Sequence, residues 1–174
     1  MVGIPGSGKS FFARQFSDTF HIPYIDYNDI GSRALDGGAS GELTLLFLRE
    51  IAKTGQTFLF EGSSDTRANR TEFAKWARAH GYTPLFVWTQ TDQATSLKRT
   101  IKAKQITRDD FATIVRDFSP PHPDEKPVVI SGKHTYASQA RTVLAHLGAD
   151  NRPKQPAPTR QPGPIPPKRN VIIR

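Results

Sequence analysis

The fold is decided by the stretch Gly3-Ile4-Pro5-Gly6-Ser7-Gly8-Lys9-Ser10, which fits the pattern G-x-x-x-x-G-K-[ST] of a phosphate-binding loop. Its glycines let successive backbone N–H groups turn inward and approach an anion, which a Cβ atom would obstruct. In this pattern Lys9 reaches the β- and γ-phosphates of a nucleotide, and the hydroxyl of Ser10 is placed to bind Mg²⁺. The stretch therefore predicts a site for a nucleoside triphosphate and Mg²⁺ at the start of a helix.

Such a loop joins a buried strand to a helix, and its two sides differ in this sequence. After the loop, the apolar residues from Phe11 to Phe16 lie at helical spacing, and His21-Ile22-Pro23 stops the helix. Before it stand only Met1 and Val2, whereas a buried strand usually takes about five or six residues. We therefore expect a truncated first strand, with the natural start of the chain upstream.

Composition narrows the class of protein. The 174 residues suit one domain with a substantial core, and the chain has no cysteine, which excludes disulfides and thiolate metal sites. No apolar run approaches the roughly 20 residues of a membrane span, and no stretch resembles a secretory signal. The histidines lack the spacing of metal ligands. We therefore expect a cytoplasmic protein without a structural metal site.

The net charge of +8 is concentrated in the last residues. Residues 151–174 contain six basic side chains, no acid and seven of the fourteen prolines. This composition predicts a folded domain over residues 1–148 and a basic, proline-rich, disordered tail over 149–174. The tail is either a solubilising linker or a site for nucleic acid or a protein partner. Its apolar end, 171–173, either adds as an edge strand to a sheet or frays.

Strand and helix signals alternate through the domain, which predicts an α/β fold with a mostly parallel sheet. The predicted strands are 22–25, 57–60, 85–88 and 128–130, and the predicted helices after the first are 41–53, 71–80, 94–104 and 136–147. On helix 41–53 the apolar face is predicted to comprise Leu43, Leu46, Phe47 and Ile51.

Acidic residues follow several predicted strands, where open parallel sheets bind their ligands. Asp26 and Asp29 follow the second strand, Glu61 ends the third with Asp65 close behind, and Asp92 follows the fourth. Phosphoryl transfer needs one carboxylate to activate an acceptor hydroxyl and another to position Mg²⁺. We assign these roles to Asp29 and Glu61. The alternative is that these acids only cap helices.

Basic residues suggest a lid and a substrate site. The predicted lid cations, which would cover a transferring phosphoryl group, are Lys98, Arg99, Lys102, Lys104 and Arg108. A solvated helix face is the alternative for Lys102 and Lys104. Arg67 and Arg70 either hold substrate anions or lie on the surface, and Lys133-His134-Thr135 is a candidate wall of the adenine pocket.

Short motifs recur in a characteristic order over residues 3–147: Gly3 to Ser10, Asn28-Asp29-Ile30, Phe60-Glu61-Gly62 through Arg70, Leu97-Lys98-Arg99, and Pro120-Pro121-His122-Pro123-Asp124-Glu125. This order resembles the P-loop kinases of the 5′-hydroxyl polynucleotide kinase type, with zeta toxins as relatives. The resemblance implies a three-layer P-loop NTPase fold with a five-stranded parallel sheet in the order 2-3-1-4-5. It also implies ATP- and Mg²⁺-dependent transfer of a phosphoryl group to a hydroxyl.

Site residues follow position by position from the resemblance. Asp29 matches the acid that activates the acceptor, and Arg99 matches a lid arginine that contacts ATP. The predicted catalytic residues are Lys9, Asp29, Glu61 and Arg99, the Mg²⁺ ligands are Ser10 and Glu61, and the nucleotide-binding residues are Gly3, Pro5, Gly6, Ser7, Gly8, Lys9, Ser10, Phe11 and Arg99.

The sequence also departs from the family. The motif after the second strand usually has two adjacent acids, so Asp26 as well as Asp29 is a candidate base. Glu61 stands where relatives tend to have aspartate, and it either holds Mg²⁺ or is the base itself. Asp65 is a further candidate for the base. Lys104 stands where a second lid arginine is common, and lysine offers no bidentate contact.

Three functions remain open. The first is a kinase for a polynucleotide 5′-hydroxyl or a small metabolite. The second is a zeta-toxin-like kinase for nucleotide sugars. The third is a binding module that ATP switches and whose tail recruits a partner.

Overall fold

The structure is a computed structural model that describes residues 1–34, 36–62, 64–103 and 106–150. The predictions for Lys104 and for residues 151–174 lie outside this part of the chain. In chain order the elements are α1 (Lys9–Phe20), β1 (Tyr24–Asp26), α2 (Tyr27–Gly31), α3 (Gly37–Thr54), β2 (Leu59–Glu61), α4 (Arg67–Ala79), β3 (Val87–Gln90), α5 (Gln93–Lys102), α6 (Arg108–Asp117), the 3₁₀ turn η1 (Pro123–Glu125), β4 (Val128–Ser131) and α7 (Tyr136–Asp150).

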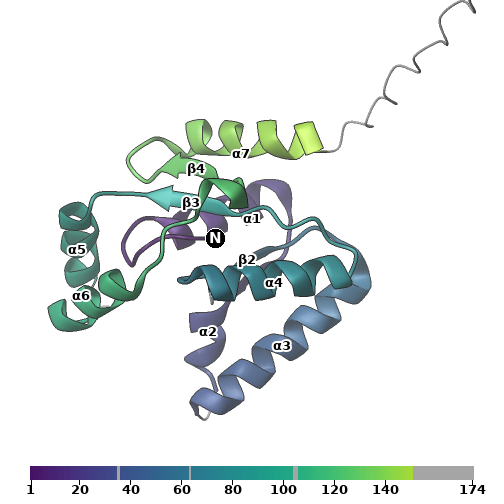
Figure 1. The fold of residues 1–174 in the computed structure, drawn as a ribbon, viewed down its shortest axis with the longest axis horizontal. Helices are drawn as coiled ribbons and strands as arrows, with labels where there is room; N and C mark the ends of the chain where they lie inside the picture. Colours follow the sequence, from purple (N-terminus) through teal and green to yellow (C-terminus); the bar gives the residue numbers. More distant parts are fainter. Residues whose placement is uncertain (35, 63, 104–105, 151–174) are drawn as a thin grey trace, which may run out of the picture.

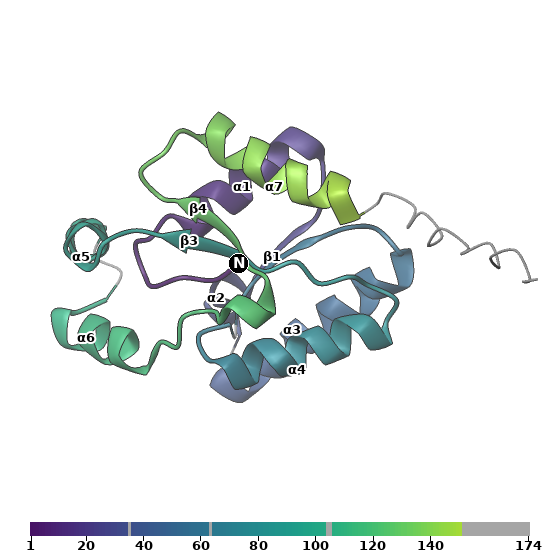
Figure 2. The same ribbon diagram turned by 45° about the horizontal axis from the view of Figure 1, so that its top comes forward.

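Helices lie on both faces of the strands, so the predicted α/β architecture with parallel strands is confirmed. Helices α1 and α7 lie side by side on one face, and α4 with α3 lies on the other (Figures 1 and 2). Helices α5 and α6 lie together at one end of the strands (Figure 1). No helix in the described ranges is both long enough and apolar enough to cross a membrane.

The strands form two parallel pairs. β1 pairs with β2, with Asp26 opposite Glu61, and β3 pairs with β4. Between the pairs lie the first residues of the chain: the backbone nitrogen of Met1 donates to the carbonyl of Phe60 (2.7 Å), and Val2 forms a parallel bridge to Trp88. Where the sequence predicted one five-stranded sheet, the described chain therefore has two two-stranded sheets, because two residues make a single bridge and not a ladder.

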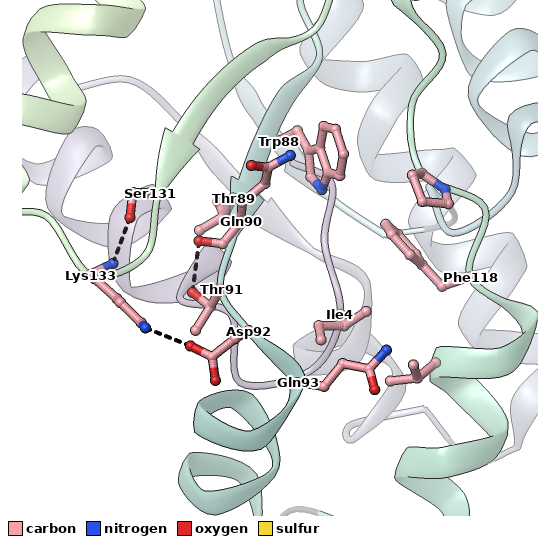
Figure 3. Close-up of a pocket in the computed structure, with 12 residues that line it drawn as sticks. Ile4, Trp88, Thr89, Gln90, Thr91, Asp92, Gln93, Phe118, Ser131 and Lys133 are labelled. Carbon is pink, nitrogen blue, oxygen red and sulfur yellow. Dashed lines mark hydrogen bonds and ion pairs between the residues drawn. The ribbon is translucent and has the colours of Figure 1, made fainter.

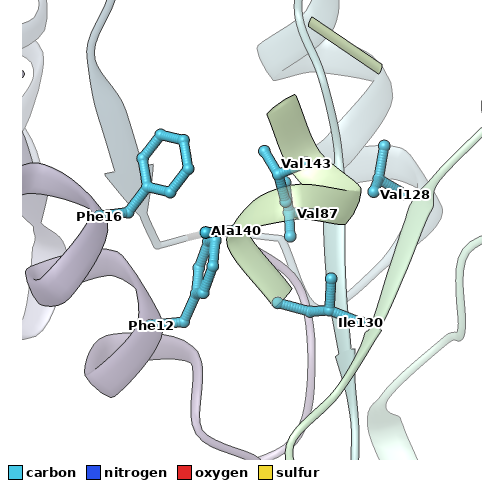
Figure 4. Close-up of a cluster of buried hydrophobic side chains, with 7 residues drawn as sticks. All are labelled: Phe12, Phe16, Val87, Val128, Ile130, Ala140 and Val143. Atoms are coloured by element: carbon cyan, nitrogen blue, oxygen red, sulfur yellow. The ribbon is translucent and has the colours of Figure 1, made fainter. Parts of the chain in front are cut away.

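The hydrophobic core lies between α1, α7 and the β3–β4 pair. Phe12 and Phe16 of α1 meet Ala140 and Val143 of α7 over the valines and isoleucine of the strands (Figure 4). Phe12 is fully buried, and its ring lies 5.3 Å from that of Phe16. Because α1 begins at the phosphate-binding loop, this packing fixes the direction in which the loop faces.

The predicted apolar face of the helix around residues 41–53 is wrong. In α3 the buried side chains include Ser40, Thr44 and Leu48, whereas Leu46 and Phe47 are each more than half exposed. The reason is the close approach of α2, where a Cβ atom on Gly31 would lie 3.0 Å from the Ser40 hydroxyl. A small residue at position 40 permits that approach, and the buried stripe then continues through Thr44 to Leu48.

Arg70 is a structural residue, which corrects the alternatives of a substrate-binding or a surface arginine. Its side chain is fully buried on α4. It forms a bidentate ion pair with Glu125 (2.7 and 3.0 Å) and donates to the carbonyls of Ser64 (2.9 Å) and Ser119 (2.8 Å). The hydrogen bond from Arg70 holds the pKa of Glu125 below its ordinary value. One guanidinium thus ties α4 to two loops and to η1.

Replacing Arg70 by methionine is expected to lower the free energy of unfolding by about 3–5 kcal/mol, because it leaves the Glu125 carboxylate without its buried partner. Chemical denaturation measures this change. The matched control is Arg67→Ala, since Arg67 is exposed and lies 4.0 Å from Asp124; its cost should stay below about 1 kcal/mol. Equal effects of the two variants would contradict the structural role of Arg70.

Candidate active site

The phosphate-binding loop is held in a conformation that requires glycine. Gly3, Gly6 and Gly8 have φ values of 144°, 74° and 105°, a region that side chains rarely tolerate. A Cβ atom on Gly6 would collide with the carbonyl oxygen of Ser96 in α5. The backbone of the loop is therefore fixed by its neighbours, as a preformed anion site requires.

Three side chains meet at the first turn of α1. The Ser10 hydroxyl donates to the Glu61 carboxylate at the end of β2 (3.0 Å), and the Lys9 ammonium lies 3.9 Å from the same oxygen. Lys9 also donates to the carbonyl of Ile4 (3.1 Å). The second oxygen of Glu61 accepts from the Tyr24 hydroxyl (2.7 Å). The buried Glu61 carboxylate thus connects β1, β2 and the loop.

Burial shifts the pKa of two members of this cluster, Lys9 and Tyr24, in opposite directions. Burial lowers the pKa of Lys9, and the negative charge of Glu61 opposes that shift. Burial, together with the carboxylates of Glu61 and Asp26, raises the pKa of Tyr24 far above its ordinary value. Tyr24 therefore keeps its proton and remains a donor to Glu61.

The candidate bases lie in different environments. Asp26 ends β1, and one of its carboxylate oxygens accepts from the backbone N–H of Asn28 as the cap of α2 (3.0 Å). Its other oxygen lies 3.1 Å from the Tyr24 hydroxyl, whose single proton is shared with the nearer Glu61 oxygen (2.7 Å). Asp29 lies in the first turn of α2, half exposed, and pairs with Arg33 at 2.7 Å. Burial lowers the pKa of Lys9, and the charges of Asp65 and Asp26 both oppose that shift, as the charge of Glu61 does. The structure thus places Asp26 next to the Lys9 cluster and Asp29 at the surface.

A cavity of about 450 Å³ opens beside the loop. Arg99 lines it and donates to the carbonyl of Gly132 (3.2 Å) and, at 3.5 Å, to that of Gly6. Phe11, whose side chain is 64% exposed, lines it as well, together with His134. The cavity therefore offers an aromatic face, a cation and the loop backbone together, which suits a nucleotide.

The other predicted residues lie elsewhere. Lys98, Lys102 and Arg108 are exposed on α5 and α6. Asp92 caps α5 by accepting from Thr95 N–H (2.8 Å) and also pairs with Lys133 at 2.6 Å.

Sequence reasoning missed several contacts of the site. Tyr24 falls in a predicted strand, and the sequence does not indicate that its hydroxyl orients Glu61. Thr91 donates to the carbonyl of Ser7 (3.0 Å), and a Cβ atom on Gly132 would collide with that same carbonyl. Thr91 and Gly132 come directly after β3 and β4. The available signal was thus a threonine and a glycine within three residues of the ends of two predicted strands.

Comparisons with known proteins bear on the fold. No family model matches this chain, nor does any curated protein. Among solved structures the chain is similar to a gluconokinase from Sinorhizobium meliloti 1021, with a TM-score of 0.61 and 17% sequence identity over 85% of this chain and 89% of that chain. At this identity the likeness shows a shared fold and no more.

Replacing Gly6 by alanine is expected to destabilise the protein by at least about 2 kcal/mol, because the new Cβ meets a backbone carbonyl at a strained φ. ATP binding should be lost as well. The matched control is Gly41→Ala in α3, where an added Cβ meets nothing within 4 Å; it should stabilise the helix by about 0.5–1 kcal/mol. Thermal unfolding and nucleotide titration measure both effects, and a Gly6→Ala variant with unchanged stability would refute the packing described.

Proposed function

We propose that this protein is a phosphotransferase that moves the γ-phosphoryl group of ATP to a hydroxyl group of an acceptor. The observation that carries the proposal is the meeting of Lys9, Ser10 and Glu61 at the first turn of α1, beside a cavity that holds Arg99 and Phe11. A glycine loop alone binds phosphate, whereas a loop joined to a buried carboxylate also provides for a metal ion. The P-loop kinase fold supports the same reaction class.

The roles of the residues follow from their positions. The loop N–H groups and the N-terminus of α1 bind phosphate oxygens, and Lys9 exchanges the Ile4 carbonyl for the β- and γ-phosphates. Arg99 exchanges carbonyl partners for phosphate in the same way. Phe11 gives the adenine a face to stack on.

Ser10 and Glu61 fit Mg²⁺, because the ion prefers oxygen ligands and their hydroxyl and carboxylate oxygens lie 3.0 Å apart. Among the described residues no group of three or more His, Cys, Asp or Glu side chains gathers as a metal cage. This pattern suits an ion shared with nucleotide and water. When bound, Mg²⁺ supplies charge neutralisation at the β- and γ-phosphates.

In the proposed step, the bond between the γ-phosphorus and the bridging oxygen breaks, and a bond forms to the acceptor oxygen. ADP keeps the bridging oxygen, and the acceptor proton passes to a carboxylate. We assign this role to Asp29, because its carboxylate is half exposed to an incoming acceptor and pairs with Arg33 through one oxygen only, whereas Asp26 caps α2 through one oxygen and faces the Tyr24 hydroxyl with the other.

The proposal extends to the sheet and the acceptor. In the order 2-3-1-4-5, strand 1 would be the segment before the loop, and strands 2 to 5 would be β1 to β4. The position of Met1 and Val2 between the β1–β2 and β3–β4 pairs supports this order. Acceptors consistent with the resemblance are a polynucleotide 5′-hydroxyl, a nucleotide sugar and a small metabolite. The gluconokinase of the same fold adds gluconate as a candidate.

The test is transfer of labelled γ-phosphate from ATP with Mg²⁺ to 5′-hydroxyl DNA and RNA, nucleosides, sugars, nucleotide sugars and gluconate. Lys9→Ala should lower any transfer about 100-fold or more, because it removes a charge that stabilises the transferring group. Absence of label on every acceptor, with ATP still bound, would reject the kinase and favour a nucleotide-switched binding module.

The pair Asp29→Asn and Asp26→Asn tests the base. Asp29→Asn is expected to lower kcat about 100-fold or more with KM for ATP unchanged, because it removes the proton acceptor but no ATP contact. Asp26→Asn is the matched control and should leave kcat within about tenfold of the parent value. The reverse order of effects would transfer the role to Asp26.

A further inference from the structure

A second cavity, of about 550 Å³, lies at the end of β3 and shares no lining residue with the cavity beside Lys9. Trp88 enters it from β3, and Phe118 enters from the segment that follows α6 (Figure 3). Ile4 of the phosphate-binding loop lines the cavity below these aromatic side chains (Figure 3). The volume is in the range of about 300–1,000 Å³ that small-molecule sites occupy.

This cavity is next to the proposed reacting centre. The side chain of Ile4 lines it, and the carbonyl of Ile4 accepts the hydrogen bond from the Lys9 ammonium (3.1 Å). A single residue of the loop therefore separates the second cavity from the lysine that contacts the transferring phosphoryl group. A ligand seated here can present a hydroxyl to the loop.

The cavity offers no unpaired charge among the 12 described residues that line it. Its two charged residues, Lys133 and Asp92, pair with each other at 2.6 Å, and the Lys133 contact holds the pKa of Asp92 below its ordinary range. The remaining polar lining includes the amides of Gln90 and Gln93. An anionic ligand would have to displace the Asp92 carboxylate from Lys133, whereas aromatic walls with amides close by suit a neutral ring that carries hydroxyls without any such exchange.

We propose that this second cavity binds the ring of a neutral, hydroxyl-bearing acceptor, with Trp88 and Phe118 on the ring and Gln90 and Gln93 at its polar groups. The inference rests on the proposed phosphotransferase function and names the acceptor class of that site. Nucleosides and sugars share this chemistry, and both are arms of the test. The acceptor hydroxyl, presented past Ile4 to the loop, gains the γ-phosphoryl group and passes its proton to the carboxylate base of the reacting centre, which does not itself line this cavity.

Binding is measured first, without nucleotide, so that the result does not depend on activity. The chain has two tryptophans, and Trp76 stacks on Phe73 in α4 outside the cavity. A Trp76→Phe variant therefore leaves Trp88 as the sole fluorescent tryptophan. Red-edge excitation during titration with uridine, methyl glucoside and gluconate should give a saturable change with at least one neutral ring. Change with gluconate alone, or with none of the three, overturns the proposal.

Variants at Phe118 then link the cavity to the reaction. Phe118→Ala, and Phe118→Leu as the variant that keeps apolar bulk, should raise the acceptor KM about tenfold through lost ring contact, with KM for ATP unchanged. The matched control is Phe20→Ala, an aromatic residue of α1 that is 40% exposed and lines neither cavity. Equal acceptor KM values in both Phe118 variants and the parent overturn the proposal.

The two proposals fail in different ways. Transfer to an acceptor that leaves Trp88 fluorescence unchanged would retain the kinase and reject this cavity as its acceptor site. Saturable ring binding without transfer to any acceptor would retain the cavity as a binding site and reject the kinase.

Discussion

The constraint on which the structure depends is the absence of space around the phosphate-binding loop. Ser96 of α5 closes on Gly6 from one element, and Gly132 after β4 closes on the carbonyl of Ser7 from another. The loop has positive φ at Gly3, Gly6 and Gly8, and a side chain at Gly3 or Gly6 would have no room. Elements far apart in the sequence are thereby held against the start of α1, where the charged side chains meet.

Glu61 holds the side chains of the site together, as packing holds the backbone of the loop. A buried carboxylate is costly unless donors satisfy it, and here Ser10 and Tyr24 each donate to a different oxygen while Lys9 lies close by. The same residue thus stabilises the pairing of β1 with β2 and keeps two catalytic candidates at fixed positions. A substitution of Glu61 would therefore affect both the stability of the fold and the proposed reaction.

The sequence predicted the parts of the fold that depend on local pattern. The helix after the loop, the alternation of strands and helices and the strand at β4 follow from apolar spacing. β1, β2 and β3 each begin two residues later than predicted, because strand bounds depend on which residues find a partner. Helix α6 was not predicted from the sequence. Thr107 caps it, but the buried residue of the helix is Phe111, so the segment lacks a clear apolar face.

What the sequence could not supply depends on contacts between distant segments. In the sequence, Arg70 does not differ from other arginines of predicted helices. Its buried partner, Glu125, is supplied by η1, which lies far away along the chain. The buried face of α3 could not be chosen by apolarity, because the approach of α2 selects small side chains such as Ser40. The proximity of Asp26 to Glu61 likewise comes from strand register, which a single sequence does not contain.

The hydrogen bond between Lys9 and the Ile4 carbonyl has a consequence for turnover in the proposed reaction. The carbonyl is an intramolecular competitor of the nucleotide, because a phosphate oxygen gains the ammonium only by displacing it. Exchange of one acceptor for another yields less net free energy than formation of a new bond, so the lysine adds less to ground-state affinity than its charge suggests. As ADP leaves, the carbonyl recaptures the ammonium, which spares the buried lysine an unsatisfied state and favours departure of the product.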